Sequence, residues 1–249
     1  MPMSSQIRAI LTGHTRGLGA ALAEALLAQG ADVLAISRKR NDELAARHPG
    51  RLHEIELDLA DLPKLTEWLS GETLSGFVSG AARVLLVNNA GMLAPVGSLA
   101  DQEPAAVARA VSVNVAAPLM LAAAVVQASA QASDTRIVHV SSGAARNAYP
   151  GWSIYCATKA ALDHHARAVA LDGNRALRIC SVAPGVVDTD MQAEIRGTGL
   201  DRFPMRERFD ALKRDGQLAT PEESARKVAD YLLSEAFGDT PTADVRDLN

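Results

Sequence analysis

Short runs of β-forming residues alternate with longer helical patterns along this chain, and that alternation restricts the fold more than any other feature. We predict strands over 7–12, 32–37, 52–57, 83–87, 136–140 and 177–182, and helices over 17–29, 101–131 (one helix or a pair) and 153–171. Alternating strands and helices form a parallel sheet that helices cover on both faces. The sequence contains no linker or internal repeat. We therefore expect a three-layer α/β structure, a doubly wound parallel sheet, in a single domain over 1–249.

The composition of the chain limits the classes of binding partner that we expect. The 249 residues are 48% hydrophobic and carry a net charge of −4, which gives no electrostatic reason to expect a nucleic acid or an anionic membrane. Apolar stretches such as 119–126 are too short to cross a bilayer, and the N-terminus lacks the pattern of a signal peptide. Two cysteines, Cys156 and Cys180, are too few for a disulfide framework or a Cys-rich metal site. We expect a cytoplasmic protein without a metal.

Polar residues and glycines directly follow the predicted strands. They are Gly13, Asp58, Asn89, Ser142 and Gly185. In an open parallel sheet, ligands bind at the edge formed by the carboxyl ends of the strands. Segments that are remote in sequence are therefore expected to meet in one crevice.

The first of these segments is a glycine-rich turn, Thr12-Gly-His-Thr-Arg-Gly-Leu-Gly19, between a strand and a helix. Its glycines follow the pattern G-x-x-x-G-x-G. They permit a tight turn and a close backbone approach, while the helix N-terminus offers free N–H groups to a pyrophosphate. A plain glycine-rich turn is the alternative, but the position between strand and helix favours a dinucleotide.

The end of the second predicted strand indicates which dinucleotide. An acidic residue there would bind the ribose hydroxyl of NAD, whereas an arginine accommodates the 2′-phosphate of NADP. Here Ser37-Arg-Lys-Arg40 follows, with no carboxylate before Asp42, and Arg16 in the glycine-rich turn could reach the same phosphate. A solvated basic cluster is the alternative reading. The sequence favours NADP over NAD.

Tyr155 and Lys159 are four residues apart on a predicted helix, so their side chains share one face. A free tyrosine has a pKa of about 10. A neighbouring cation favours the phenolate and lowers that pKa, which suits a general acid or base. The spacing alone also arises by chance on exposed helix faces.

Taken together and in order, these motifs resemble the short-chain dehydrogenase/reductase family of the single-domain, Rossmann-type fold. Ser142 precedes Tyr155 by thirteen residues, as in that family. The resemblance implies that Tyr155 donates a proton to a substrate carbonyl and that Ser142 hydrogen-bonds the same oxygen. It also implies that Lys159 holds the nicotinamide ribose and lowers the pKa of Tyr155. Asn114 would anchor a water that links Lys159 to solvent, although by itself it reads as a capped polar helix residue.

The same resemblance implies a cofactor-binding set. It comprises Gly13, Thr15, Arg16, Gly17, Leu18, Gly19, Arg38, Asp58, Leu59, Asn89, Ala90, Gly91, Tyr155, Lys159, Pro184, Gly185, Val187 and Thr189. Asp58 and Leu59 would contact the adenine ring. Taken alone, Asp58 reads as a turn carboxylate at a strand end, and Asn89 as a turn residue.

A lid over the site is expected at about 190–217, where six basic and six acidic residues balance and indicate a solvated surface. Tyr149, Trp152 and Met191 are the substrate-pocket candidates. Within the family, the segments 155–161 and 244–248 resemble sepiapterin reductase and bacterial benzil reductase-like enzymes. The C-terminus lacks the Gly-Gly strand of acyl-carrier-protein and sugar-alcohol members. Diketones and other activated carbonyls are therefore the expected substrates.

The motifs are compatible with three functions. The first is an NADP-dependent carbonyl reductase, and the second is an alcohol dehydrogenase of hydroxysteroid or sugar-alcohol type that works oxidatively. The third is a noncatalytic NADP-binding regulator on the same fold. Such a regulator is expected to lose the catalytic Tyr or Lys, and both are present. The helices through Asn114 and Tyr155 resemble those that pair in this family, so we expect a homodimer or homotetramer.

Overall fold

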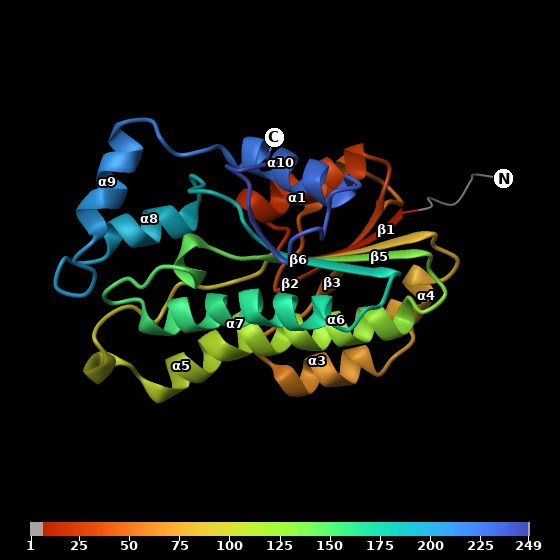
Figure 1. The fold of residues 1–249 in the computed structure, drawn as a ribbon, viewed down its shortest axis with the longest axis horizontal. Coiled ribbons are helices and arrows are strands. Elements are labelled where there is room, and N and C mark those ends of the chain that lie inside the picture. The colour runs from red at the N-terminus through yellow and green to blue at the C-terminus, as the bar shows by residue number, and fades with distance from the viewer. Residues whose placement is uncertain (1–6, 249) are drawn as a thin grey trace.

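The fold is centred on a seven-stranded, all-parallel sheet in a computed structural model that describes residues 7–248 (Figure 1). The strand order is β3-β2-β1-β4-β5-β6-β7. The strands are β1 (Ile7–Thr12), β2 (Asp32–Ser37), β3 (Leu52–Glu56), β4 (Arg83–Asn88), β5 (Asp134–Val140), β6 (Leu177–Ala183) and β7 (Thr242–Asp244). The order reverses between β1 and β4, which makes that junction the switch point of a doubly wound sheet. The predicted fold class is confirmed.

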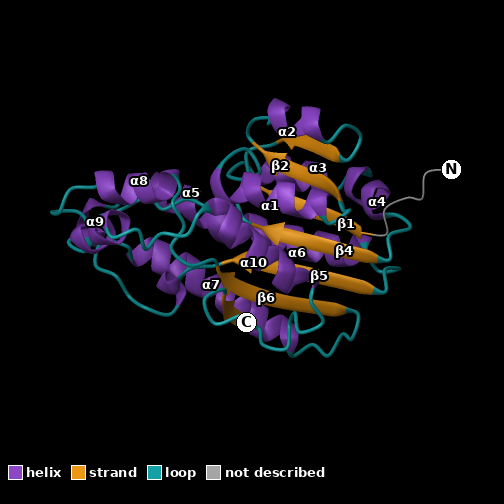
Figure 2. Cartoon of the chain, turned by 90° about the horizontal axis from the view of Figure 1, so that it is seen from above, coloured by secondary structure: helices purple, strands orange, loops and turns teal. Residues whose placement is uncertain are grey.

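Helices cover both faces of the sheet, as Figure 1 shows edge-on. One face carries α1 (Gly17–Ala28), α2 (Asp42–Arg47) and α10 (Pro221–Leu233). The other carries α3 (Leu62–Leu69), α4 (Thr73–Val78), α5 (Pro104–Val111), α6 (Ala117–Ala128) and α7 (Ser153–Ala170). Beyond the carboxyl ends of the strands lie α8 (Asp190–Gly197) and α9 (Arg206–Arg214) (Figure 2). Ligands of such sheets bind at that edge.

Two apolar cores hold these layers together because successive strand residues point to opposite faces. On β1, Leu11 packs in the core beneath α1 and α10, whereas Ile10 packs in the core beneath α6. Both residues are fully buried. Strands buried on both faces need an almost continuous apolar run, which is why this pattern was readable in the sequence.

The predicted strands agree with the structure to within two residues, but the prediction missed β7. That strand has three residues and pairs with β6 through Val182 and Ala243. The prediction also named none of α2, α3, α4 and α10. The helix predicted over 17–29 ends at Ala28, and Gly30 follows in the left-handed region at a φ of 90°, a conformation that glycine adopts without strain.

The predicted 101–131 helix is a helical run in which α5 and α6 are joined by a π-helical turn, η2 (Ser112–Ala116). The run from Pro104 to Ala128 has 25 residues and is long and apolar enough to cross a membrane, on length and composition alone. The expectation that no apolar stretch has that length is therefore wrong. Helices that pack within a fold meet the same criterion, and this run packs on α3, α4, α7 and the sheet.

An aromatic cluster fixes the segment 190–217 to the rest of the molecule. Phe203 is fully buried and stacks on Trp152 with ring centroids 4.4 Å apart, and Phe209 packs against both. Gly151 has a φ of 80°, and a Cβ at this position would lie 2.3 Å from the carbonyl oxygen of Arg202. The loop before α7 and the segment between α8 and α9 are therefore in direct backbone contact.

Candidate active site

The glycine-rich turn lies directly against the end of β4. The Asn89 side-chain amide donates to the carbonyls of Thr12 and Gly13, while the Thr12 hydroxyl accepts from the N–H groups of Asn89 and Ala90. Gly13 has a φ of 76°, and a Cβ at Gly19 would lie 1.9 Å from the Gly13 carbonyl oxygen. The glycines are therefore required by both conformation and close packing.

The segment after β6 closes the same crevice from the other side. Gly17 has a φ of 52°, and a Cβ there would lie 3.2 Å from the Thr189 side chain. Val187 forms a bridge with Ala219, and Gly185 takes a φ of 80°. The predicted contact segments 13–19 and 184–189 thus face each other. Within the first segment, Thr15 lies in the turn before α1 and Leu18 lies in the first turn of α1.

Basic residues follow β2 at the end of this crevice where the adenosine of a dinucleotide is predicted. Arg38 is exposed, and its charge acts on Asp58. Partial burial opposes ionisation of Asp58, but hydrogen bonds from the Ala60 N–H and from Arg109 outweigh it and hold the pKa of Asp58 below its usual value. Leu59 is buried beside it. The predicted adenine-side residues are therefore close to the basic segment.

Other basic groups near the crevice already have acidic partners. Arg16 forms an exposed ion pair with Asp190 at 2.7 Å. Arg40 lies 3.3 Å from Glu54, a buried carboxylate that also accepts from the Asn41 N–H and hydrogen-bonds His14. The sequence prediction overlooked Glu54, because an acidic residue inside a strand gives no signal of its partners.

Tyr155 lies in the first turn of α7, and Lys159 follows one turn later, so the predicted shared helix face is present. Tyr155 is only 6% exposed and Lys159 only 4%. The Lys159 ammonium donates to the carbonyl of Val140 at 2.8 Å and lies 5.8 Å from the centre of the Tyr155 ring. Ser142 caps a short turn after β5 by accepting from the Ala144 N–H, and it interacts with the Tyr155 hydroxyl.

Burial governs the ionisation of this pair. It raises the pKa of Tyr155 to about 12, although the contact with Ser142 favours the phenolate. Burial likewise lowers the pKa of Lys159 to about 8, against the attraction of Asp163. The expectation that Lys159 brings the pKa of Tyr155 below 10 is therefore not met in this structure, since desolvation is the larger effect.

Asn114 is buried in the π-helical turn. Its amide bonds both backbone groups of Met92, at 2.9 and 2.8 Å, and donates to the Thr158 hydroxyl at 3.1 Å. A Cβ at Gly91 would lie 3.4 Å from the Asn114 oxygen and 3.5 Å from the Lys159 nitrogen. Asn114 and Lys159 therefore face the same small space beside Gly91, which a larger residue would fill.

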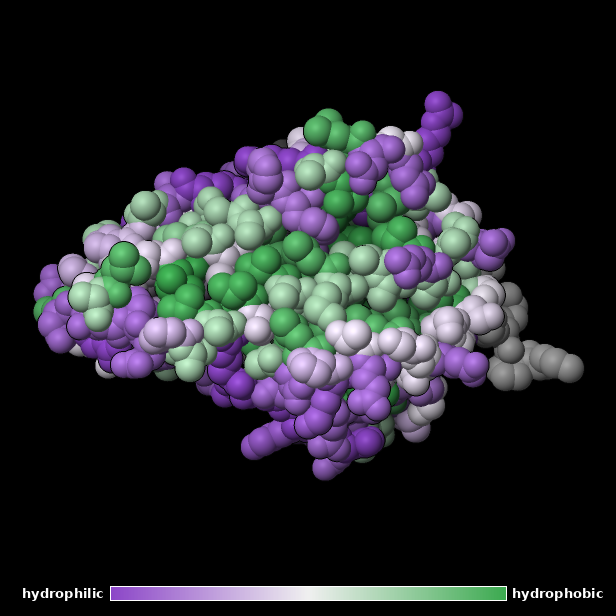
Figure 3. Space-filling view, turned by 90° about the horizontal axis from the view of Figure 1, so that it is seen from below, coloured by the Kyte–Doolittle hydropathy of each residue, from purple (hydrophilic) through white to green (hydrophobic). Residues whose placement is uncertain are grey.

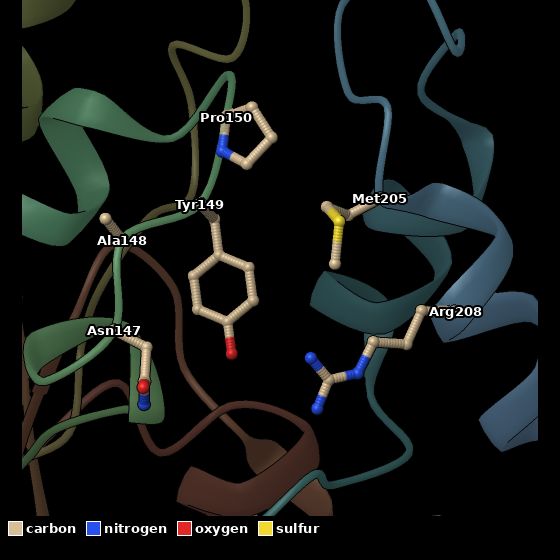
Figure 4. A pocket seen from close by; sticks show the side chains of 6 residues that line it. All are labelled: Asn147, Ala148, Tyr149, Pro150, Met205 and Arg208. Atoms are coloured by element: carbon tan, nitrogen blue, oxygen red, sulfur yellow. The ribbon is translucent and has the colours of Figure 1, made fainter.

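The substrate-side candidates have different positions. The Met191 sulfur lies 4.0 Å from the Tyr155 hydroxyl. Tyr149 lines a pocket of about 310 Å³, and its hydroxyl and the Arg208 guanidinium lie at the same end of this pocket (Figure 4). The pocket lining is Asn147, Ala148, Tyr149, Pro150, Met205 and Arg208. Trp152 is absent from this lining and is 4% exposed within the aromatic cluster. The sequence prediction did not single out Arg208, one of many charged residues in a balanced segment.

The elements fit a dinucleotide, because the positive-φ glycines 13 and 17 allow a tight turn packed closely on Ala90 and Thr189, and this turn leads directly into the N-terminus of α1. Together with the doubly wound sheet, they define the class of Rossmann-type, NAD(P)-dependent oxidoreductases. The chain belongs to the short-chain dehydrogenase/reductase family. The model of that family, described as short chain dehydrogenase, matches residues 8–199.

Individual relatives point to reductases. A benzil reductase ((S)-benzoin forming) of Bacillus cereus is 35% identical, over 92% of this chain and 94% of its own length. A sepiapterin reductase of Meriones unguiculatus is 34% identical, over 92% of each. Both subgroups named by the sequence resemblance are thus among the relatives.

Similar solved structures include members of the same family. A short-chain dehydrogenase/reductase from Burkholderia vietnamiensis is 56% identical with a TM-score of 0.73, over 99% of this chain and all of the other. A short chain dehydrogenase from Burkholderia cenocepacia in complex with NADP is 30% identical with a TM-score of 0.76, over 96% and 95%.

Proposed function

We propose that this protein is an NADPH-dependent carbonyl reductase in which Tyr155 is the general acid. The observation that carries the proposal is the gathering of half-buried Ser142 with buried Tyr155 and Lys159 at the carboxyl edge of the sheet. The similarity to benzil and sepiapterin reductases supports the direction of the reaction. Both relatives are named for reduction.

When bound, NADPH would supply a hydride to the carbonyl carbon of the substrate. Tyr155 donates its phenolic proton to the carbonyl oxygen, and Ser142 donates a hydrogen bond to the same oxygen as negative charge develops there. Because burial raises the pKa of Tyr155 to about 12, the proton is present at neutral pH. The adjacent Lys159 ammonium stabilises the phenolate that remains.

Two further roles belong to the same proposal. When the cofactor is bound, Lys159 would hold the nicotinamide ribose hydroxyls. Asn114 supports a water-mediated route by which a proton returns to the Lys159 and Tyr155 pair. The common space beside Gly91 that both Asn114 and Lys159 face supports this route.

NADP is the proposed cofactor in preference to NAD. Arg38 is exposed at the end of β2, where the 2′-phosphate of NADP is expected. Arg16 lies in the glycine-rich turn, and its partner Asp190 is itself exposed, so a phosphate can compete for this guanidinium.

The substrates proposed are diketones and other activated ketones. NADPH oxidation should be measured with benzil, other α-diketones and a pterin ketone. Turnover of these, with little reverse activity on hydroxysteroids or sugar alcohols and NADP⁺, is the expected result. The opposite pattern would favour the oxidative alcohol dehydrogenase. NADPH binding without turnover on either panel would favour the regulator.

The segment 190–217 is the proposed substrate lid within a single nucleotide-binding domain. Its helices lie beyond the strand ends (Figure 2), and Met191 lies against the Tyr155 hydroxyl. We expect Met191 to move when a ketone reaches that hydroxyl. Hydrogen exchange of α8 and α9 with and without NADPH and product tests this, and protection on binding is expected.

A homodimer or homotetramer is also proposed. The face that carries α5, α6 and α7 shows a broad apolar band (Figure 3), and the apolar residues of α5 and α6 that are not buried include Val111, Leu119 and Ala123. Apolar patches of this kind mark interaction surfaces. Light scattering should give a multiple of 26.2 kDa, and a strictly monomeric mass would contradict the proposal. A cytoplasmic location is proposed as well, because Cys156 and Cys180 are free thiols; localisation of a tagged protein tests it.

A further inference from the structure

A buried carboxylate lies one helical turn beyond Lys159. The side chain of Asp163 is 4% exposed, and it accepts three hydrogen bonds. Ser141 and Ser181 each donate a hydroxyl at 2.7 Å, and the Arg146 guanidinium donates at 3.0 Å. A buried carboxylate is costly unless it is paired in this way.

These partners belong to the segments that carry the catalytic groups. Ser141 directly precedes Ser142, and the carbonyl of Val140, one residue earlier, accepts the hydrogen bond from Lys159. Arg146 follows Ser142 on the same β5–α7 connection and also donates to the carbonyl of Ala243 on β7. Asp163 therefore joins α7 to the connection that holds Ser142.

Charge gives Asp163 a second effect on the site. Burial disfavours the ammonium form of Lys159, and Asp163 is the group that acts in the opposite direction. Arg146 in turn carries a positive charge against Asp163. Asp163 thus attracts both Arg146, with which it is paired, and Lys159, one turn earlier on α7, while these two cations repel each other.

Of the other titratable groups around these three residues, Tyr155, Cys180 and the two histidines are neutral in the middle of the pH range. Burial raises the pKa of Tyr155 to about 12 and that of Cys180 to about 11, and it lowers the pKa of His139 to about 3. His165, which bonds His139, also has a lowered pKa because of burial. On β7, Asp244 faces Arg146 but is paired with Arg246.

We infer that Asp163 is a positioning residue for the reaction: it keeps the Lys159 ammonium charged and fixes the connection that presents Ser142. The inference rests on the proposed function, since it assigns work to Lys159 within it. A purely structural role for Asp163 would lower activity in its variants without changing the pH dependence.

The test compares the pH profiles of two variants. Two quantities are measured as a function of pH, kcat/KM with the best ketone and the NADPH dissociation constant from fluorescence, and the position of the alkaline limb of each profile is compared with that of the wild type. Asp163→Asn removes the attraction, so the limb should move to lower pH by about one unit. Arg146→Gln removes a repulsive charge and leaves Asp163 less neutralised, so the limb should move to higher pH. Opposite shifts support the inference, and limbs that stay in place or move together overturn it.

Ser181→Ala is the matched control, because it removes one hydrogen bond to Asp163 and leaves every charge in place. The alkaline limb of its pH profile should lie at the same pH as that of the wild type. A shift like that of Asp163→Asn would overturn the role of charge. Should Asp163→Asn not fold, Arg146→Gln decides alone: an upward shift supports the inference, and no shift overturns it. A wild type that binds NADPH but reduces no ketone would instead contradict the proposed function. In that case the pH dependence of the NADPH dissociation constant would still test the role of Asp163.

Discussion

The carboxyl edge of the sheet and the segment 190–217 enclose the same site but are built differently. At the sheet edge, backbone groups and short polar side chains hold one another, as Asn89 does with Thr12 and Gly13. The lid segment is instead held by an aromatic cluster around Trp152 and Phe203 and by exposed ion pairs such as Arg16 with Asp190. We therefore expect the edge to set the reaction type and the proposed lid to set the choice of substrate.

The largest effect that would test this division is expected at the edge. Tyr155→Phe removes only the proton donor, so turnover should fall by about a thousandfold. NADPH affinity should stay within a few-fold, because the ring and Lys159 remain. Steady-state kinetics and fluorescence titration measure the two quantities. Retained turnover would remove Tyr155 from the proposed mechanism.

In the lid, Phe203→Ala should cost about 3 kcal/mol of local stability, since it deletes a fully buried ring from the cluster. We expect faster hydrogen exchange in α8 and α9 and a higher KM for the ketone, with NADPH binding unchanged. Leu121→Ala, in the core beneath α6, is the control and should loosen the sheet instead. Equal exchange in the lid of both variants would contradict the division.

Acid should destabilise the fold through a buried histidine of the sheet. Burial lowers the pKa of His139 on β5 to about 3, against 6.5 for an unperturbed histidine. Between these values the unfolded chain binds a proton that the native fold does not, so the free energy of unfolding falls as pH falls. From pH 6.5 to 5 the loss is about 2 kcal/mol. Urea unfolding measures it, and His139→Gln should lack this component.

The smallest effect concerns the cofactor. Arg38→Asp places a negative charge where the 2′-phosphate is expected, so the preference for NADPH over NADH should fall by about tenfold, or about 1.4 kcal/mol. The ratio of kcat/KM values for the two cofactors measures this. Lys39→Asp is the matched control, and an unchanged ratio in Arg38→Asp would move the assignment to Lys39 or Arg16.

The sheet and the edge could be predicted from the sequence because their signals are local. Apolar runs mark buried strands, and glycines at 13, 17 and 19 mark a turn that needs positive φ or close packing. The strand β7 was missed because three residues carry too little pattern. The π-helical turn at Asn114 was missed because it departs from a helix by one residue.

The net effect of burial could not be predicted. The spacing of Tyr155 and Lys159 was evident, but the degree to which the surrounding layers exclude water from them was not, so the expected pKa direction for Tyr155 was wrong. Trp152 likewise offered no sign that Phe203, fifty-one residues away, would stack on it. Such contacts depend on how the chain folds over itself.

The π-helical turn has a consequence for how this helix can vary. One additional residue in the turn rotates everything after it by about 100° relative to everything before, so α5 and α6 are out of phase with each other. Deleting a single residue between 112 and 116 would bring them back into phase as one regular helix. Either Asn114 would then turn away from Met92, or Leu121 and Val125 would turn away from the core. Substitutions can therefore accumulate along this helix, but a change in its length cannot.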